Sequence, residues 1–311
     1  MRTLICGSLA YDTITVFPDR FGKHILPDRT HMISVSFVVG DMRREWGGCA
    51  GNIAYNLKAL GGEPVVMATL GEDGAAYRER LQSLGIGIEG VKTLGDTFTA
   101  QAFIITDLDD NQITAFHPGA MVRSHELRVE QVADVKLGIV APDGRDGMLA
   151  HAAQFREHGV PYIFDPGQGL PLFSGDELAS MIEGALAVTV NDYEASLLCE
   201  RTRLSESDIA RRVEALIVTL GGEGSRIHTG GSTITIPAVP APTLVDPTGC
   251  GDAYRAGLLY GVAQGWIWEK SGRLATLLGS IKIGSRGGQN HAIDRETVAA
   301  AYRKVFGSTL W

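Results

Sequence analysis

The amino-acid sequence predicts an α/β protein with three layers, in which a central and mainly parallel β-sheet carries helices on both faces. Short apolar runs alternate with amphipathic helical segments along most of the chain. Two further segments with the pattern of partly exposed strands interrupt this alternation and predict a small second sheet. The length of 311 residues is sufficient for one large α/β unit with such an appendage.

Short apolar runs indicate the strands of the central sheet. Buried strands of a parallel sheet are almost entirely apolar, because helices cover both faces of the sheet. Runs of this kind lie at Thr3–Cys6, Val65–Leu70, Leu137–Ala141, Tyr162–Phe164, Ala187–Val190 and Leu216–Leu220.

Helical segments separate several of these runs. Ile53, Leu57 and Leu60 recur at the spacing of one helical face, and Gly61 follows them. A second segment of this kind ends at Gly85, where glycine permits the left-handed conformation that caps a helix. Strands that alternate with helices form right-handed βαβ units, and these units place helices on both faces of the sheet.

Two segments predict the small sheet. Ile33–Val39 alternates apolar with small or polar residues, which is typical of a strand with one buried face. Phe98–Thr106 and Gln112–Phe116 flank a polar turn and predict a hairpin. We expect this sheet to be a lid over the carboxyl ends of the main strands, where open α/β sheets bind ligands. The body then comprises residues 1–12, 47–96 and 119–311, and the lid comprises residues 13–46 and 97–118.

Composition and charge argue against several classes of function. The formal charge of −8 argues against general binding to nucleic acid or to an anionic membrane, because both need a basic surface. No apolar run has the length of a membrane-spanning helix or a signal peptide. The four cysteines lack the spacing of a zinc site. These features predict a cytoplasmic enzyme with reduced thiols.

The segment Asp246–Gly257 carries the clearest chemical signal. Gly249 and Gly251 flank Cys250 before a helix, so the backbone amides of this turn can point at an anion. Asp252 stands at the mouth of the turn, where a carboxylate can accept the proton of an attacking hydroxyl. The alternative interpretation is a helix N-cap after a glycine loop. A P-loop of the form Gly-x-x-x-x-Gly-Lys does not occur in the sequence.

The same segment resembles the C-terminal signature of the ribokinase-like carbohydrate kinases. Gly47–Ala54, followed by Leu60-Gly61 and Leu70–Gly74, is similar to the N-terminal signature of that family. The resemblance therefore spans nearly the full chain. It implies a ribokinase-like fold and an ATP-dependent phosphotransferase that acts on an alcohol group. In the family pattern Asp252 is the general base, and the anion hole consists of Gly249, Cys250 and Gly251.

The resemblance also implies where ATP and Mg²⁺ bind. Asn191 and Glu194 match an element that organises phosphate and Mg²⁺-bound water, and Glu194 would act on Mg²⁺ through water. The alternative for this pair is a strand end that caps a helix. A glycine-rich loop follows, and it matches the nucleotide loop or, alternatively, a turn before a hairpin. The implied ATP-binding residues are Asn191, Glu194, Thr219, Gly221, Gly224 and Gln289.

A monovalent-cation site is implied beside the anion hole. Asp246 and Thr248, together with carbonyl groups of the loop Ser285–His291, match the family's K⁺ site. Oxygen ligands suit K⁺, which makes this ion an expected activator. The alternative is that Asp246 is a turn residue before Pro247.

Residues near the start of the chain are candidates for holding a sugar. Ser8 and Asp12 follow the first strand, and Asn52 follows the pair Gly47 and Gly48. A carboxylate accepts hydrogen bonds and an amide both donates and accepts, so the two groups can hold adjacent hydroxyls of a furanose ring. The alternatives are a surface turn for Asp12 and a helix cap for Asn52.

The lid segments resemble bacterial adenosine kinases of the ribokinase-like type. By this resemblance Phe116 would stack on a purine, and Ser36 and Gln168 would contact its polar edge. Ala102 stands where the resemblance leads us to expect an aromatic residue, so the stack is either one-sided or built differently. The alternative for Phe37 and Phe116 is a place in the core of the lid, and for Phe37 we prefer it.

Three functions follow from these observations. The first is an adenosine kinase that converts adenosine and ATP to AMP and ADP, and the second is a ribose or other sugar kinase with the same mechanism. The third is an inactive nucleoside-binding module, although such a module has no chemical need for Asp252, Asn191 and Glu194 together. The exposed edge of the lid sheet also suggests a homodimer.

Overall fold

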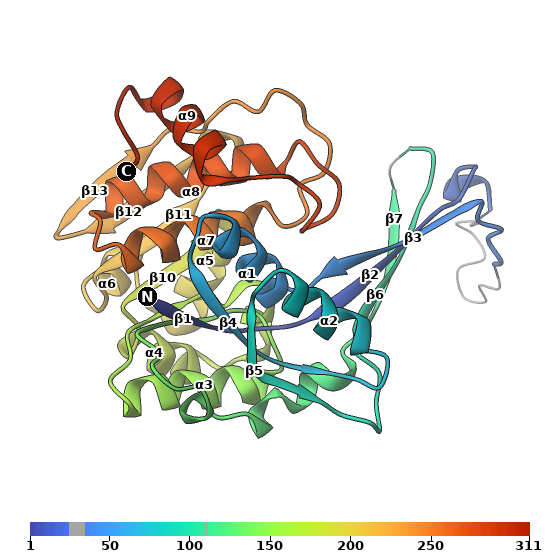
Figure 1. The fold of residues 1–311 in the computed structure, drawn as a ribbon, viewed down its shortest axis with the longest axis horizontal. Helices are drawn as coiled ribbons and strands as arrows, with labels where there is room; N and C mark the ends of the chain where they lie inside the picture. The colour runs from blue at the N-terminus through green and yellow to red at the C-terminus, as the bar shows by residue number, and fades with distance from the viewer. Residues whose placement is uncertain (25–34, 110) are drawn as a thin grey trace.

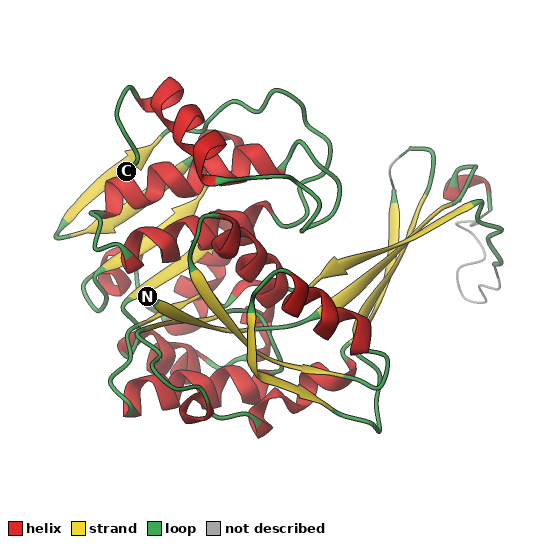
Figure 2. Ribbon diagram, in the orientation of Figure 1, coloured by secondary structure: helices red, strands yellow, loops and turns green. Residues whose placement is uncertain are grey.

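The computed structural model describes residues 1–24, 35–109 and 111–311. Within these residues the chain forms a nine-stranded main sheet and a four-stranded second sheet. The second sheet extends away from the body (Figure 1). Helices flank the main sheet on both sides (Figure 2), so the predicted three-layer α/β fold is confirmed.

Neighbouring strands of the main sheet are parallel from β11 to β5, and the hairpin of β12 and β13 adds antiparallel strands at one edge. The predicted buried strands are all present, and β5 is a further edge strand. In spatial order the strands are β13 (Ser232–Ile236), β12 (Ser225–Thr229), β11 (Ala215–Thr219), β10 (Ala187–Asn191), β9 (Tyr162–Phe164), β8 (Leu137–Val140), β1 (Arg2–Cys6), β4 (Glu63–Leu70) and β5 (Gly87–Thr93).

Each face of the main sheet has its own core. One core contains side chains of α1 (Cys49–Ala59), α2 (Ala75–Ser83), α7 (Cys250–Ala263), α8 (Trp268–Lys282) and α9 (Arg295–Phe306). The other contains side chains of α3 (Arg145–Glu157), α4 (Gly175–Glu183), α5 (Asp192–Thr202) and α6 (Glu206–Ala210). Strand β1 serves both cores, because Ile5 faces the first and Leu4 the second. In the described ranges no helix is long and apolar enough to cross a bilayer.

Short 3₁₀ segments supplement these helices in the loops. They are η1 (Phe21–Lys23), η3 (Gly119–Glu126), η4 (Val129–Gln131), η5 (Gly167–Leu172) and η6 (Gly221–Glu223).

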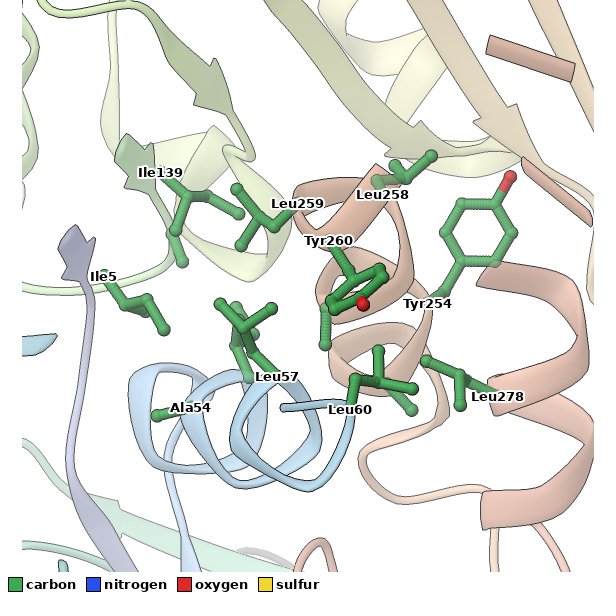
Figure 3. Packing of buried hydrophobic residues seen from close by; sticks show 14 of the residues in the cluster. Ile5, Ala54, Leu57, Leu60, Ile139, Tyr254, Leu258, Leu259, Tyr260 and Leu278 are labelled. Atoms are coloured by element: carbon green, nitrogen blue, oxygen red, sulfur yellow. The ribbon is translucent and has the colours of Figure 1, made fainter. Parts of the chain in front are cut away.

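Helices α1 and α7 pack together, and this contact positions the site. Leu57 of α1 and Leu60, which caps its C-terminus, point toward α7, and Leu259 of α7 points toward Ile139 of β8 (Figure 3). All four side chains are buried. Burial of a leucine side chain stabilises a fold by about 1.5–3 kcal/mol, so the relative position of the two helices is well determined.

The second sheet has the strand order β3–β2–β6–β7. Its predicted hairpin is present as β6 (Ala100–Thr106) and β7 (Gln112–His117). The other pair is β2 (Ala10–Val16) and β3 (Asp41–Gly47), and β2 joins the hairpin through a parallel contact with β6. The predicted lid boundary after residue 12 therefore falls inside a strand, and the division into body and lid stays a prediction.

The predicted strand Ile33–Val39 is not found. Residues 33 and 34 lie outside the described residues, and residues 35–39 form no strand. The ring of Phe37 lies 4.7 Å from that of Phe17 and 5.1 Å from that of Phe21, measured between centroids. Phe37 thus packs in an aromatic cluster of the lid, as preferred for it, and not in a strand.

Candidate active site

Predicted site residues gather at one edge of the main sheet. Ser8 follows β1 and Asp165 follows β9, while Asn191 ends β10 and Thr219 ends β11. Asn191 and Thr219 are direct register partners. Because these strands are parallel, their carboxyl ends meet at the edge where open α/β sheets bind ligands.

A cavity of about 760 Å³ lies between this edge and the lid. It brings together residues that are distant in the sequence, from the first strand, the start of α1, the lid and the turn before α7. The predicted site residues that line it are Ser8, Asp12, Gly48, Asn52, Phe116, Gln168, Thr248, Gly249 and Asp252. Further lining residues without a predicted role include Ala10, Ala102, Ile104, Thr114, Met121 and Pro142.

The turn before α7 contains backbone amides that can bind an anion. Gly249 is the N-cap of α7 with a φ of +79°, and an added Cβ would lie 3.0 Å from Cα of Gly288. In the described part of the chain, the amides of Gly249 and Gly251 have no internal partner, as expected at a helix N-terminus. The amide of Cys250 differs from the prediction, because it donates to the carbonyl of Pro247 at 3.1 Å.

Asp252 lies in the first turn of α7 and is held from α1. Nδ2 of Asn52 donates to Oδ2 of Asp252 at 2.8 Å. Burial raises the pKa of Asp252 to about 6, and the hydrogen bond from Asn52 and the charge of Arg255 oppose that rise. A carboxylate with a pKa in this range is a better proton acceptor than an ordinary aspartate and is still mostly ionised at neutral pH.

Gln289 is not placed for the predicted contact with ATP. Its side chain is buried, and its Nε2 donates to Oδ1 of Asn52 at 3.2 Å and to the Tyr77 hydroxyl at 2.8 Å. The Tyr77 hydroxyl in turn donates to the carbonyl of Gly47 at 2.6 Å. Gln289 thus fixes the orientation of the Asn52 amide, and through it the position of Asp252.

Arg255 is a second charged neighbour of Asp252 and had no predicted role. Its Nε and Nη2 donate to the two carboxylate oxygens of Asp165 at 2.9 and 3.0 Å, and both side chains are buried. This two-point ion pair joins the first turns of α7 to the end of β9. The only signal for it in the sequence is an arginine one helical turn after Asp252.

Asp12 faces the cavity from β2. An added Cβ on Gly47 would lie 2.5 Å from Oδ2 of Asp12, so only glycine leaves room for this carboxylate. Burial raises the pKa of Asp12 to about 6, and the carboxylates of Asp246, Asp252 and Glu45 add to the rise. Ser8 is buried beside it, and its Oγ accepts the Cys49 amide at the start of α1 at 3.2 Å.

The lid presents one face of its sheet to the cavity. Ala102 of β6 and Phe116 of β7 are register partners, and both line the cavity. Phe116 has 53% of its surface exposed, so its ring is available to a ligand. Phe103 lies on the opposite face of the sheet. Ser36 is exposed and does not line the cavity, so the structure does not bring it to the predicted place.

The predicted ATP and Mg²⁺ residues occupy the neighbouring strand ends. Asn191 and Glu194 form a capping box at the start of α5, with bonds of 2.7 and 2.8 Å, as their alternative interpretation stated. This box uses one Glu194 oxygen, and the carboxylate keeps a second one for a hydrated Mg²⁺, so the residues fit that ion. Burial raises the pKa of Glu194. Gly221 and Gly224 form the turn after Thr219, both with positive φ.

The residues of the predicted K⁺ site do not fit a free ion. The carboxylate of Asp246 accepts the amides of Thr248 at 2.9 Å and Gly287 at 2.8 Å. The main-chain carbonyl of Asp246 and that of Ser285 both accept hydrogen bonds from the ammonium of Lys282. A cation of the protein itself therefore holds the carbonyl oxygens that a K⁺ ion between these segments would need.

Comparisons with known proteins identify the family. The pfkB family carbohydrate kinases match residues 26–295. A nucleoside kinase of Methanocaldococcus jannaschii is 32% identical over 260 residues, which cover 83% of this chain and 85% of the relative. A nucleoside kinase of Methanothermobacter thermautotrophicus is 31% identical over 280 residues, covering 88% and 90%.

Solved structures agree with this assignment. A nucleoside kinase of Burkholderia thailandensis, solved in complex with inosine, is 52% identical with a TM-score of 0.90, and 99% of each chain is covered. The same relative has been solved in complex with ADP-inosine. On the evidence of its two signatures, its fold and these relatives, the chain belongs to the pfkB family of ribokinase-like carbohydrate kinases and is a phosphotransferase with an alcohol group as acceptor.

Proposed function

We propose that the protein phosphorylates the 5′-hydroxyl of adenosine with ATP, giving AMP and ADP. The observation that carries this proposal is the cavity, in which Asp252 and a lid face that carries Phe116 enclose one space. A sugar alone needs only the polar end of such a space. The nucleoside kinases among the relatives, and the inosine bound to one of them, support a nucleoside acceptor.

The proposed chemistry is an in-line transfer with Asp252 as the general base. The 5′ oxygen forms a bond to the γ-phosphorus of ATP while the bond from that phosphorus to the bridging oxygen breaks, so ADP leaves. The hydroxyl proton passes to Asp252. The amides of Gly249 and Gly251 stabilise the charge on the transferred group. Mg²⁺, held near Glu194 through water, neutralises phosphate charge when it is bound.

The ribose and the base are held by different elements. Asp12 accepts hydrogen bonds from ribose hydroxyls, and Asn52 donates one N–H to Asp252 and keeps the other for substrate. Phe116 stacks on the purine, which contributes about 1–3 kcal/mol. The Gln168 amide lies in the same cavity and both donates and accepts, so it can bind the 6-amino group of adenosine or the 6-oxo group of inosine.

A panel of acceptors tests this function. Adenosine, inosine, ribose and fructose are each incubated with ATP and Mg²⁺, and ADP formation is measured. We expect the kcat/KM of adenosine to exceed that of ribose by about 5- to 150-fold, which is the effect of losing one stacking contact. Equal efficiency with ribose or fructose would indicate the sugar kinase, and no turnover with nucleoside binding retained would indicate the inactive module.

We also propose that the protein forms a homodimer through the lid. The lid face that points away from the cavity carries the row Met42, Ile105 and Ile113, in register across β3, β6 and β7. Phe103 adds to this face, with 46% of its surface exposed. Light scattering of the wild type and of a Phe103→Glu, Ile113→Glu double variant tests the proposal. Equal mass for the two proteins would contradict it.

A further inference from the structure

Lys282 is a fully buried lysine beside the anion hole. It is the last residue of α8, between two isoleucines, and its side chain has 0% of its surface exposed. Its Nζ donates to the carbonyl oxygen of Asp246 at 2.8 Å and to that of Ser285 at 2.9 Å. Burying an ammonium group destabilises the fold unless hydrogen bonds and nearby charges compensate the loss of water. The two carbonyl groups provide this compensation for Lys282.

The hydrogen bonds of Lys282 connect two segments, one that lines the cavity and one that leads to Gln289, which holds Asn52 in place. Asp246 begins the turn that leads to Gly249 and Gly251, and Ser285 begins the loop that leads to Gln289. The carboxylate of Asp246 makes a second connection, through the amide of Gly287 at 2.8 Å. The turn of the anion hole is therefore tied to the loop behind it by one carboxylate and one ammonium.

A monovalent cation at the same place would do the same work, because K⁺ and an ammonium group both carry one positive charge and both bind carbonyl oxygens. We propose that the ammonium of Lys282 replaces the monovalent cation at this site, so that the enzyme positions its anion hole without K⁺. Lys282 is a positioning residue in this proposal, since it acts through Asp246 on the turn that holds Gly249. The proposal rests on the phosphotransferase function argued above.

The wild-type enzyme gives the first test. Turnover of adenosine is measured in K⁺, in Na⁺ and in tetramethylammonium at matched ionic strength, with saturating Mg²⁺. We expect rates within about twofold in the three salts, because Lys282 already occupies the position of the cation. Tetramethylammonium serves as the reference salt, since this ion is too large to bind between the carbonyl groups. Stimulation by K⁺ of about tenfold or more would overturn the proposal, and this test requires no variant.

Two substitutions give the second test. Lys282→Met removes the charge at similar volume, and we expect kcat to fall by about 10- to 100-fold, as for a misplaced catalytic group, with little change in the adenosine KM. Lys282→Ala leaves space beside the two carbonyl groups. We expect K⁺ or NH₄⁺, but not tetramethylammonium, to restore part of its activity. Lys270→Met, on the same helix but beside Trp266, is the matched control and should keep wild-type rates in every salt.

A measurement without turnover separates this inference from the proposed function. The midpoint of thermal unfolding of Lys282→Ala should rise in K⁺ relative to tetramethylammonium, because an ion that binds only the folded state stabilises it. The wild type should show no such difference. A rise in the wild type, or equal midpoints for Lys282→Ala in both salts, would contradict the replacement of an ion by Lys282 even if no acceptor were turned over.

Discussion

At the scale of the residue, the proposed role of Asp252 as general base makes activity depend on the protonation of its carboxylate. Its pKa is raised to about 6 by burial, and the base must be ionised to accept the substrate proton. We therefore expect kcat/KM for adenosine to be constant at neutral pH and to fall as the pH drops through about 6. Asp12 has its pKa raised into the same range, so the fall should be steeper than a single proton gives.

A substitution at Asn52 should shift the pH at which the rate falls, that is, the acidic limb of the pH profile. Its hydrogen bond to Asp252 stabilises the charged form and lowers the pKa. Replacing Asn52 by Ala removes this bond, so the acidic limb of log kcat against pH should shift to higher pH. Asp12→Asn gives the opposite comparison, because it removes a negative charge that interacts with Asp252. It should make the acidic limb less steep and shift the remaining limb to lower pH. An unchanged profile in Asn52→Ala would contradict the assignment of the limb to Asp252.

At the scale of the element, the two faces of the lid sheet allow a matched comparison. Phe116→Ala should lower kcat/KM for adenosine by about 5- to 150-fold, the loss of one stacking contact, and should leave weak ribose turnover nearly unchanged. Phe103→Ala removes a ring of similar exposure from the opposite face of the same hairpin and should have little effect on either substrate. Equal damage by both substitutions, or equal damage to both substrates, would indicate a general role in lid folding.

The connection between α7 and β9 depends on the pair of Arg255 and Asp165. Arg255→Met leaves a buried carboxylate without its partner, which costs about 3–5 kcal/mol of unfolding free energy. Urea denaturation measures this loss, and adding Asp165→Asn should recover part of it. Arg20→Met, in an exposed pair with Asp109, is the control and should lose much less stability. Similar losses in the two single variants would show that the buried pair has no special role.

At the scale of the whole molecule, the sequence predicts local features better than contacts between distant segments. The buried strands and the hairpin were predicted because each is a continuous local pattern. Strand β5, with the sequence Gly-Ile-Glu-Gly-Val-Lys-Thr, was missed because an edge strand carries few apolar residues. The pattern at Ile33–Val39 predicts a strand that residues 35–39 do not form, because Phe37 packs against Phe17 and Phe21 instead.

Within the site, the resemblance supplied the residues of the cavity but not those that support them. Gln289 was predicted to contact ATP, and its bond to Asn52 joins positions that are 237 residues apart. In the sequence Lys282 is a single charged residue between two apolar residues at the end of a helix, and this pattern does not indicate its contacts. Neither contact follows from periodicity or spacing, because each depends on how α1, α7 and α8 pack in space.

These distant segments combine in one site, for which we propose Asp252 as the general base. The most direct test is the kcat of Asp252→Asn with adenosine and ATP, together with its adenosine Kd from calorimetry. Asparagine keeps the size of the side chain and its contact with Asn52 but cannot accept the proton. We predict that kcat falls by about 10²–10⁴-fold with little change in Kd. Near-normal turnover in this variant would contradict the account and place the base elsewhere.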